Sequence, residues 1–172
     1  MFEQRHIAFF TATILEWKHL LKPEKYKAII LESLKYLVEH KRVKVYGFVI
    51  MPNHLHLLWK MEEPHKREDV QRDFMKFTAQ QIKYDLIRNH PAVLEKFRVG
   101  AKDRQYQLWE RNPLSVYCFS TAVTEQKLSY IHRNPIQEKW QLAALPEEYP
   151  YSSARFYFEN KDDFGFLTHY MD

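Results

Sequence analysis

The 172-residue sequence has only three glycines and one cysteine, and each shortage excludes a class of site. Three glycines cannot build the glycine-rich phosphate loop of a Walker or Rossmann nucleotide site. The single cysteine, Cys118, excludes an intramolecular disulfide and a zinc–thiolate cluster. Its apolar neighbours in the segment 116–119 favour a buried thiol that packs as a small hydrophobic side chain.

Long apolar runs are also missing. No uninterrupted segment approaches the ~20 residues that a membrane span requires, and residues 1–6 lack the basic-then-apolar pattern of a signal peptide. We therefore expect a cytoplasmic protein with no membrane partner. Hydrophobic residues at 45% and aromatic residues at 16% are typical of a folded chain. The length suits one domain over residues 1–172, and the net charge of +4 permits an anionic partner without requiring one.

Hydrophobic periodicity predicts an α+β fold. We expect strands over residues 6–13, 43–51, 54–61 and 105–109. We expect helices over residues 24–40, 67–89 and 121–133, a basic loop over 91–104, and an aromatic tail over 136–172 that packs on the body. This order matches a ferredoxin-like split βαβ fold, which is an antiparallel sheet with helices packed on one face. The helix at 121–133 would then be a further C-terminal helix.

Two histidines lie at the start of the strand predicted at 54–61. Because side chains alternate along a strand, His54 and His56 share one face, and Leu55, Leu57 and Trp59 share the other. Neutral imidazoles carry a lone pair, so a pair on one face can chelate a divalent metal. The plainer interpretation is one satisfied interior histidine and one on a wet sheet face. The pair alone leaves both interpretations open.

The helix at 121–133 has a polar side that includes a tyrosine. Leu128 and Ile131 fall on one side of the helix, whereas Tyr130 and Asn134 fall roughly opposite and are neighbours four residues apart. Asn134 could place its amide oxygen on a metal held by the histidine pair, with the Tyr130 hydroxyl beside it. Taken alone, each residue has a simpler explanation: Asn134 stops the helix before Pro135, and Tyr130 is a half-exposed aromatic.

Positive charge is concentrated on the helix at 67–89 and in the loop that follows it. Scattered charge on a helix is usually solvated surface, and the helix taken alone favours that interpretation. Alternatively, such a helix follows a phosphate backbone. The candidate DNA-binding residues are Arg67, Arg72, Lys76, Lys83, Arg98, Lys102, Arg104 and Arg133.

Two motifs together carry a resemblance to a known family. His54-Leu55-His56 and Tyr130-Ile131-His132-Arg133-Asn134-Pro135 resemble the HUH-type single-strand DNA tyrosine transposases of bacterial insertion sequences. They are most similar to the REP-associated tyrosine transposases, and the segments 111–113 and 148–153 share this likeness. The resemblance therefore covers almost the whole chain. His-hydrophobic-His alone is weakly specific, but the combination with Tyr-x-x-x-Asn-Pro in this order is strongly specific.

The resemblance implies a site and a reaction. His54, His56 and Asn134 would be the ligands of Mg²⁺ or Mn²⁺, and Tyr130 would be the catalytic nucleophile. Some relatives have glutamine where this chain has Asn134, so this chain presents the same amide group on a shorter side chain. The implied activity is cleavage and rejoining of single-stranded or hairpin DNA through a covalent 5′-phosphotyrosine. The resemblance also implies a homodimer and the split βαβ fold.

Two other functions stay open. A hydrolytic metalloenzyme or oxygenase would complete the histidine pair with a carboxylate from elsewhere in the fold, and would not need Tyr130. A catalytically idle hairpin-binding protein derived from such a transposase would keep salt-dependent binding of DNA or RNA after loss of Tyr130.

Overall fold

A computed structural model describes residues 5–172 of the chain. Four strands form one antiparallel sheet in the order β2–β3–β1–β4. Their bounds are Ile7–Thr13 for β1, Val43–Ile50 for β2, His54–Met61 for β3 and Leu114–Cys118 for β4. Because β3 lies between β1 and β2, the β1–helix–β2 connection passes over β3. This is the split βαβ arrangement that the sequence predicts.

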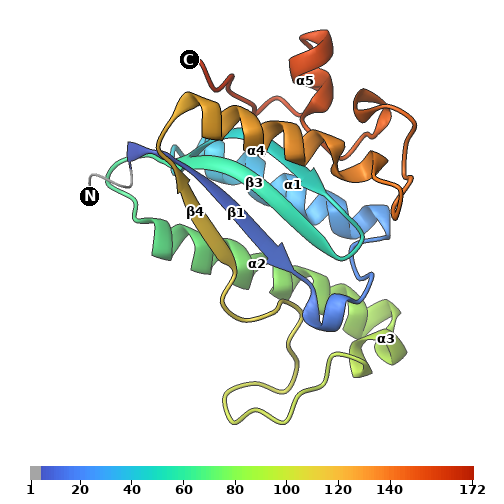
Figure 1. The fold of residues 1–172 in the computed structure, drawn as a ribbon. Helices are drawn as coiled ribbons and strands as arrows, with labels where there is room; N and C mark the ends of the chain where they lie inside the picture. The colour runs from blue at the N-terminus through green and yellow to red at the C-terminus, as the bar shows by residue number, and fades with distance from the viewer. Residues whose placement is uncertain (1–4) are drawn as a thin grey trace.

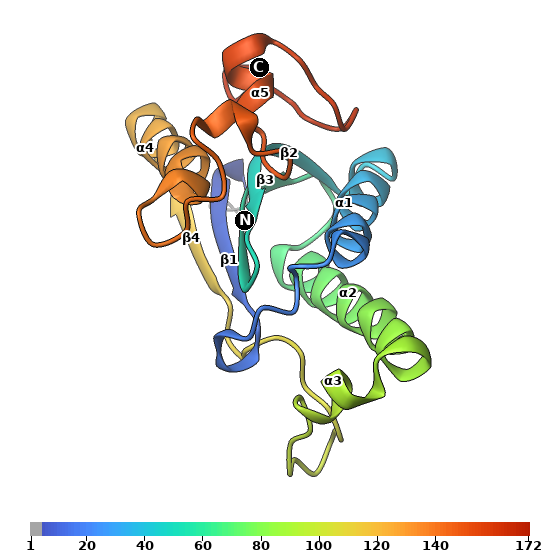
Figure 2. The same ribbon diagram turned by 90° about the vertical axis from the view of Figure 1, so that its right-hand side faces the viewer.

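Helices cover both faces of this sheet. Figures 1 and 2 show α1 (Glu24–Glu39) and α2 (Arg67–Asn89) together on one face, and α4 (Thr121–Arg133) on the opposite face. The shorter helices are α3 (Pro91–Glu95) and α5 (Ala154–Glu159), with 3-10 turns at η2 (Leu15–Trp17), η3 (Asn134–Ile136) and η4 (Pro146–Glu148). The predicted packing on one face therefore describes α1 and α2, and α4 stands apart from them.

The face under α1 and α2 is the more apolar of the two. Phe10 of β1 and Trp59 of β3 are fully buried against Phe74 of α2, with ring centroids 5.2 Å apart between the two strand residues. Their neighbours Leu55 and Leu57 on β3 are equally buried. Alternation along β3 thus places every second residue in a continuous apolar core, as the strand period requires.

The predicted strand at 105–109 is wrong, and the fourth strand lies nine residues later in the chain. Leu108 and Trp109 are buried, so their hydrophobicity is used for packing. The segment, however, meets other backbone only through isolated bridges, Arg98 with Tyr106 and Ile14 with Trp109. The pairing edge of β1 is taken by Leu114–Cys118, which runs beside it from Leu114 opposite Thr11. The alternating apolar pattern of this segment therefore reflects burial of its side chains and not pairing in the sheet.

Two smaller features differ from or extend the sequence expectations. The predicted loop at 91–104 begins with α3, which has Pro91 in its first turn, a position that proline tolerates. Cys118 is buried, as its apolar surroundings suggest. No helix within residues 5–172 is long and apolar enough to cross a membrane.

The aromatic tail lies along the outer edge of β2. Tyr149 and Tyr157 donate from their hydroxyls to the backbone carbonyls of Ile50 and Tyr46, each at 2.6 Å. The tail backbone adds bonds to the same strand, including Ser153 N–H to the Phe48 carbonyl at 3.0 Å. The edge of β2 is thereby covered, which satisfies backbone groups that an open edge would expose.

Candidate active site on the α4 face of the sheet

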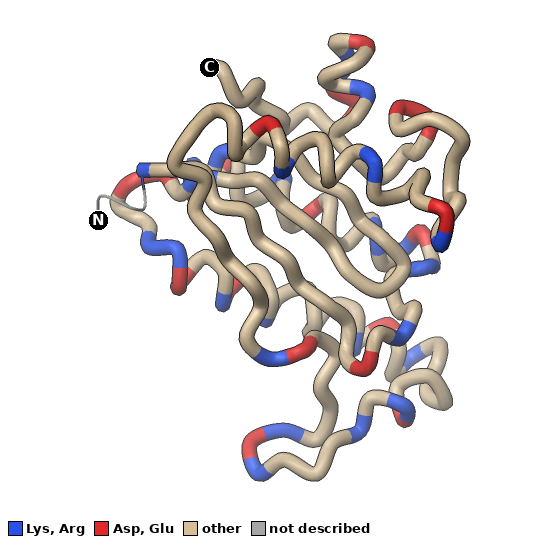
Figure 3. The backbone as a smooth tube through the Cα atoms, in the orientation of Figure 1, with Lys and Arg blue, Asp and Glu red and all other residues tan. Residues whose placement is uncertain are grey.

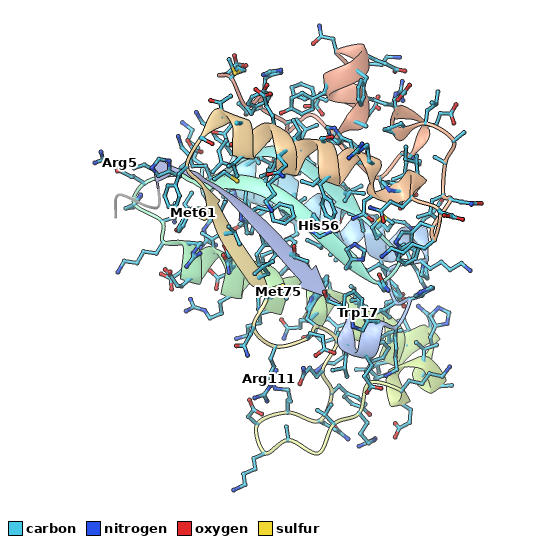
Figure 4. The ribbon with its side chains drawn as sticks, viewed as in Figure 1. Arg5, Trp17, His56, Met61, Met75 and Arg111 are labelled. Carbon is cyan, nitrogen blue, oxygen red and sulfur yellow. The ribbon has the colours of Figure 1, made fainter. Side chains whose placement is uncertain are left out.

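The strand register places the histidine pair beside two threonines. His54 is opposite Thr13 and His56 is opposite Thr11 across the β1–β3 ladder, so all four side chains are on one face. This is the face that α4 covers, and Figure 4 shows His56 beneath that helix. The two imidazole centroids are 4.9 Å apart. The alternation predicted from sequence therefore brings the pair together on the α4 side.

Hydrogen bonds fix how each imidazole points. Asn53 Oδ1 lies 2.7 Å from His54 Nδ1, and since an amide oxygen only accepts, Nδ1 carries the proton and Nε2 keeps its lone pair. Thr11 Oγ1 lies 2.8 Å from His56 Nδ1, while His56 Nε2 is buried with no hydrogen-bond partner. Such outer partners are what orient metal-binding histidines in proteins. His54 Nε2 is thus available as a ligand, and so is His56 Nε2 in the tautomer whose Nδ1 donates to Thr11 Oγ1.

Burial keeps both imidazoles neutral at physiological pH. It lowers the pKa of His54 to about 4, with a smaller contribution from the positive charge of Lys139. Burial, together with smaller contributions from His54 and Lys127, lowers the pKa of His56 to about 3. A neutral imidazole is the form that coordinates a metal. The electrostatics of the pair therefore suit metal binding without any pH adjustment.

Asn134 joins the pair from the end of α4. It is 2% exposed, and its Nδ2 lies 3.4 Å from His54 Nε2. Turning the amide over about its terminal torsion would direct Oδ1 at the same place, because the oxygen and nitrogen of an amide occupy equivalent positions. Two imidazoles and one amide oxygen, with an unpartnered buried Nε2 on His56, form a donor set that fits a divalent cation.

The competing carboxylate-completed site finds no support in the part of the chain that is described. Within residues 5–172, no group of three or more His, Cys, Asp or Glu side chains is placed to hold a metal ion. Asn134 is the neutral amide placed against His54.

Tyr130 lies at the mouth of the same site. Its ring centroid is 5.3 Å from that of His56 and 6.3 Å from that of Phe9, in edge-on contacts. The side chain is 45% exposed, so a substrate can reach the phenol. Leu128 and Ile131 of the same helix are buried against the sheet, which leaves Tyr130 on the side that borders the histidines. The helical spacing predicted this division of α4.

A pocket of about 450 Å³ connects these groups. Its lining includes two lysines that the sequence reasoning missed, Lys127 and Lys139, and no acidic side chain from residues 5–172. Lys127 precedes Tyr130 by three residues and so shares its helix side, which is a signal the sequence contains. Lys139 follows the turn after Pro135, and only the tertiary fold brings it here. The pocket is therefore positively charged and suited to an anionic group.

The eight predicted DNA-binding residues do not gather at this pocket. Arg72, Lys76, Lys83 and Arg104 line a separate groove of about 720 Å³ between α2 and the segment 103–113. Helix α2 is on the opposite face of the sheet from α4 (Figure 2). Figure 3 shows that β1 and β4 carry no Lys or Arg, whereas the helices and loops around the sheet carry many charged residues.

The other four predicted basic residues are scattered. Arg67 donates to Ser115 Oγ at 3.0 Å and lies over the Tyr117 ring, so it ties α2 to β4. Arg98 pairs with Glu95. Lys102 is exposed in the loop after α3, and Arg133 is exposed and lines a different pocket, which Phe158 also lines. Sequence composition identified positive residues but not the surfaces they form.

Comparison with known proteins identifies the fold. No protein-family model and no curated protein sequence matches this chain. A solved REP-associated tyrosine transposase bound to a REP hairpin matches with a TM-score of 0.66 and 16% identity, covering 98% of this chain and 88% of that chain. A protein of Deinococcus radiodurans described as a transposase matches with a TM-score of 0.48 and 13% identity, covering 74% of this chain and 88% of that chain. The chain has an α+β fold of the kind seen in REP-associated tyrosine transposases.

Proposed function

We propose that this protein cleaves and rejoins single-stranded or hairpin DNA through a covalent 5′-phosphotyrosine on Tyr130. The observation that carries the proposal is the convergence of four side chains from two distant segments. The Tyr130 ring lies 5.3 Å from His56, and the Asn134 amide lies 3.4 Å from His54. A fold shared with a hairpin-bound transposase supports the same function.

His54, His56 and Asn134 would hold Mg²⁺ or Mn²⁺. Bound there, a divalent cation supplies polarisation of the scissile phosphate and neutralises the charge that develops on it. Imidazole ligands suit Mn²⁺ better, whereas Mg²⁺ prefers oxygen. Asn53 and Thr11 hydrogen-bond to the Nδ1 atoms of His54 and His56, which leaves Nε2 as the ring nitrogen of each that could bind the cation.

The reaction uses Tyr130 as its nucleophile. The phenol oxygen attacks the phosphorus, an oxygen–phosphorus bond forms, and the bond to the 3′ oxygen breaks, so that the departing strand ends in a free 3′-hydroxyl after taking up a proton. A 3′-hydroxyl later attacks the phosphotyrosine and regenerates the phenol. The bond energy is conserved through both steps. Lys127 and Lys139 place positive charge where the phosphate backbone enters the pocket.

We propose further that Tyr130 serves the site of its own subunit, in a monomer or in a homodimer alike. The tyrosine and the histidines of one chain already line one pocket. A mixture of Tyr130→Phe and His56→Ala proteins should then form no covalent adduct. Recovery of adduct in the mixture would show that the tyrosine acts on the partner's site.

The direct test is a search for the adduct. The protein is incubated with single-stranded DNA from the flanks of its own gene plus Mn²⁺ or Mg²⁺, and products are separated under denaturing conditions. Wild-type protein should migrate with attached DNA, and Tyr130→Phe should bind the DNA but form no adduct. Tyr84→Phe is the matched control, since Tyr84 is similarly exposed at 53% on α2. Adduct formation by Tyr130→Phe would refute the proposal, and wild-type binding without adduct would favour the idle hairpin-binding alternative.

A further inference from the structure

One large aromatic side chain stands exposed at the edge of the candidate site. Trp17 is 62% exposed, although tryptophan is usually well buried. It lines the pocket with the histidine pair, and its ring centroid is 6.3 Å from that of His54 in an edge-on contact. Figure 4 shows it just beyond the end of β1. The proposed chemistry gives this indole no role.

The backbone holds Trp17 in an unfavourable conformation. Glu16 and Trp17 have φ angles of 55° and 58°, in the left-handed region that L-residues seldom adopt. Three hydrogen bonds fix this turn: Glu16 N–H to a Glu110 carboxylate oxygen at 2.7 Å, Trp17 N–H to the Ile14 carbonyl at 2.9 Å, and Asn53 Nδ2 to the Trp17 carbonyl at 3.4 Å. Strain of this kind persists where the surroundings over-determine it, often at ligand sites.

The fixed turn also connects Trp17 to the histidines. Asn53 bonds the Trp17 carbonyl through its amide nitrogen and bonds His54 Nδ1 through its amide oxygen. The backbone of Trp17 is therefore held at a set position relative to the imidazole. Trp140, half-buried, flanks His54 with a centroid distance of 6.1 Å. Trp17 differs from it because much of its surface stays open to solvent.

The pocket chemistry indicates what the open indole would bind. Lys127 and Lys139 line the pocket and, within residues 5–172, no acidic side chain does, which favours an anionic chain. An exposed indole offers a flat apolar ring, and unpaired nucleobases stack on such rings irrespective of their identity. Positive charge for phosphates together with an aromatic face for bases is the combination that binds single-stranded nucleic acid.

We propose that Trp17 is a stacking platform for one unpaired nucleobase adjacent to the phosphate that enters the His54–His56–Tyr130 pocket. The position next to the reacting phosphate rests on the proposed function, whereas the stacking itself does not. Trp17 is a positioning residue, because it contacts a base and takes no part in bond making. Its effect is to fix the register of the strand in the pocket.

The test measures binding by Tyr130→Phe protein, which cannot cleave, to fluorescein-labelled single-stranded DNA from the gene's flanks. Adding Trp17→Ala should weaken binding roughly tenfold, and Trp17→Phe should restore most of the affinity because a ring remains. Phe158→Ala is the matched control: Phe158 is 61% exposed but lines a different pocket. Thermal melting of each variant separates loss of binding from loss of folding.

An abasic scan gives the decisive readout. A single abasic site is moved along the DNA. At one position it should weaken binding to the Tyr130→Phe protein as much as adding Trp17→Ala does. That same position should have no further effect on the Trp17→Ala protein, since the base and the ring form one contact. The inference would be overturned if the affinity losses from the abasic site and from Trp17→Ala added together at every position. It would also be overturned if Trp17→Ala changed the affinity by no more than about twofold, or if the protein did not bind the DNA at all.

The two proposals fail in different ways. If wild-type protein forms no adduct but the abasic penalty disappears in Trp17→Ala, the stacking platform stands and the phosphotyrosine chemistry falls. If the adduct forms normally with Trp17→Ala and the penalties are additive, the chemistry stands and the platform falls.

Discussion

The two faces of the same sheet differ in what covers them and in what they can do. On the α1–α2 face, Phe10, Leu57 and Trp59 are fully buried in an apolar core. On the α4 face, neighbouring positions of the same strands carry the half-buried Thr11 and the buried His56, which are hydrogen-bonded to each other at 2.8 Å. Two helices close the first face, whereas α4 and residues of the C-terminal tail such as Tyr149 cover the second, with a pocket beside α4. The comparison teaches that the larger apolar core lies on one face and the candidate site on the other.

The largest expected effect is on stability, at the apolar face under α1 and α2. Trp59→Ala should lower the free energy of unfolding by about 3–5 kcal/mol, because the indole is fully buried between Phe10 and Phe74 and its removal leaves a cavity. Urea denaturation of wild type and variant measures the loss. A change below about 1 kcal/mol would mean that this face is not the main source of stability.

On the polar face, the expected effect is on activity. His54→Ala should reduce the rate of adduct formation at least ~100-fold, because the donor set for the metal is broken. Its unfolding free energy should fall by less than that of Trp59→Ala, since the imidazole buries less apolar surface than the indole. Parallel adduct assays and melts measure both quantities. Loss of folding with His54→Ala would contradict the division between the two faces.

The contact between α4 and the sheet gives the next test. Gly47 on β2 lies under Leu128, and a Cβ at Gly47 would be 2.5 Å from Leu128 Cδ1. Gly47→Ala should therefore cost about 1–3 kcal/mol through overpacking. It should also slow adduct formation, because α4 carries Tyr130. Gly100→Ala, with nothing within 4 Å of the new Cβ, is the matched control. Equal stability of the two variants would show that α4 does not depend on this close approach.

The smallest predicted effect is a pH dependence. His132 of α4 is buried beside Ser153, and burial lowers its pKa to about 4. Since an unfolded histidine has a pKa near 6.5, the unfolded state binds more protons between these values. Its contribution to stability is thus complete above pH 6.5 and is lost as pH falls towards 4.

His132→Gln provides the comparison. Between pH 7 and pH 5, His132 should contribute on the order of 1–2 kcal/mol to the fall in stability, and the variant should lose less than wild type by this amount. Urea titrations at the two pH values measure the difference. Identical pH dependence in both proteins would show that His132 is not held neutral by burial.

Local sequence signals predicted a good part of this molecule. The two-residue period of β3 placed His54 and His56 on one face, and the 3.6-residue period of α4 separated Tyr130 from Leu128. The helices at 24–40 and 67–89 and the hairpin between them also lie where periodicity placed them. The strand at 105–109 was misplaced because burial of Leu108 and Trp109 gives the same apolar pattern as strand pairing.

The sequence by itself determined which side chains share a face, because that depends only on the repeat of the local backbone. Only the tertiary structure decided which faces meet. It laid α4 over the histidines and not beside α1 and α2, brought Lys139 and Trp17 to the same pocket, and left the basic residues of α2 on the far side. These placements arise from packing between segments more than a hundred residues apart, and no local period records such packing.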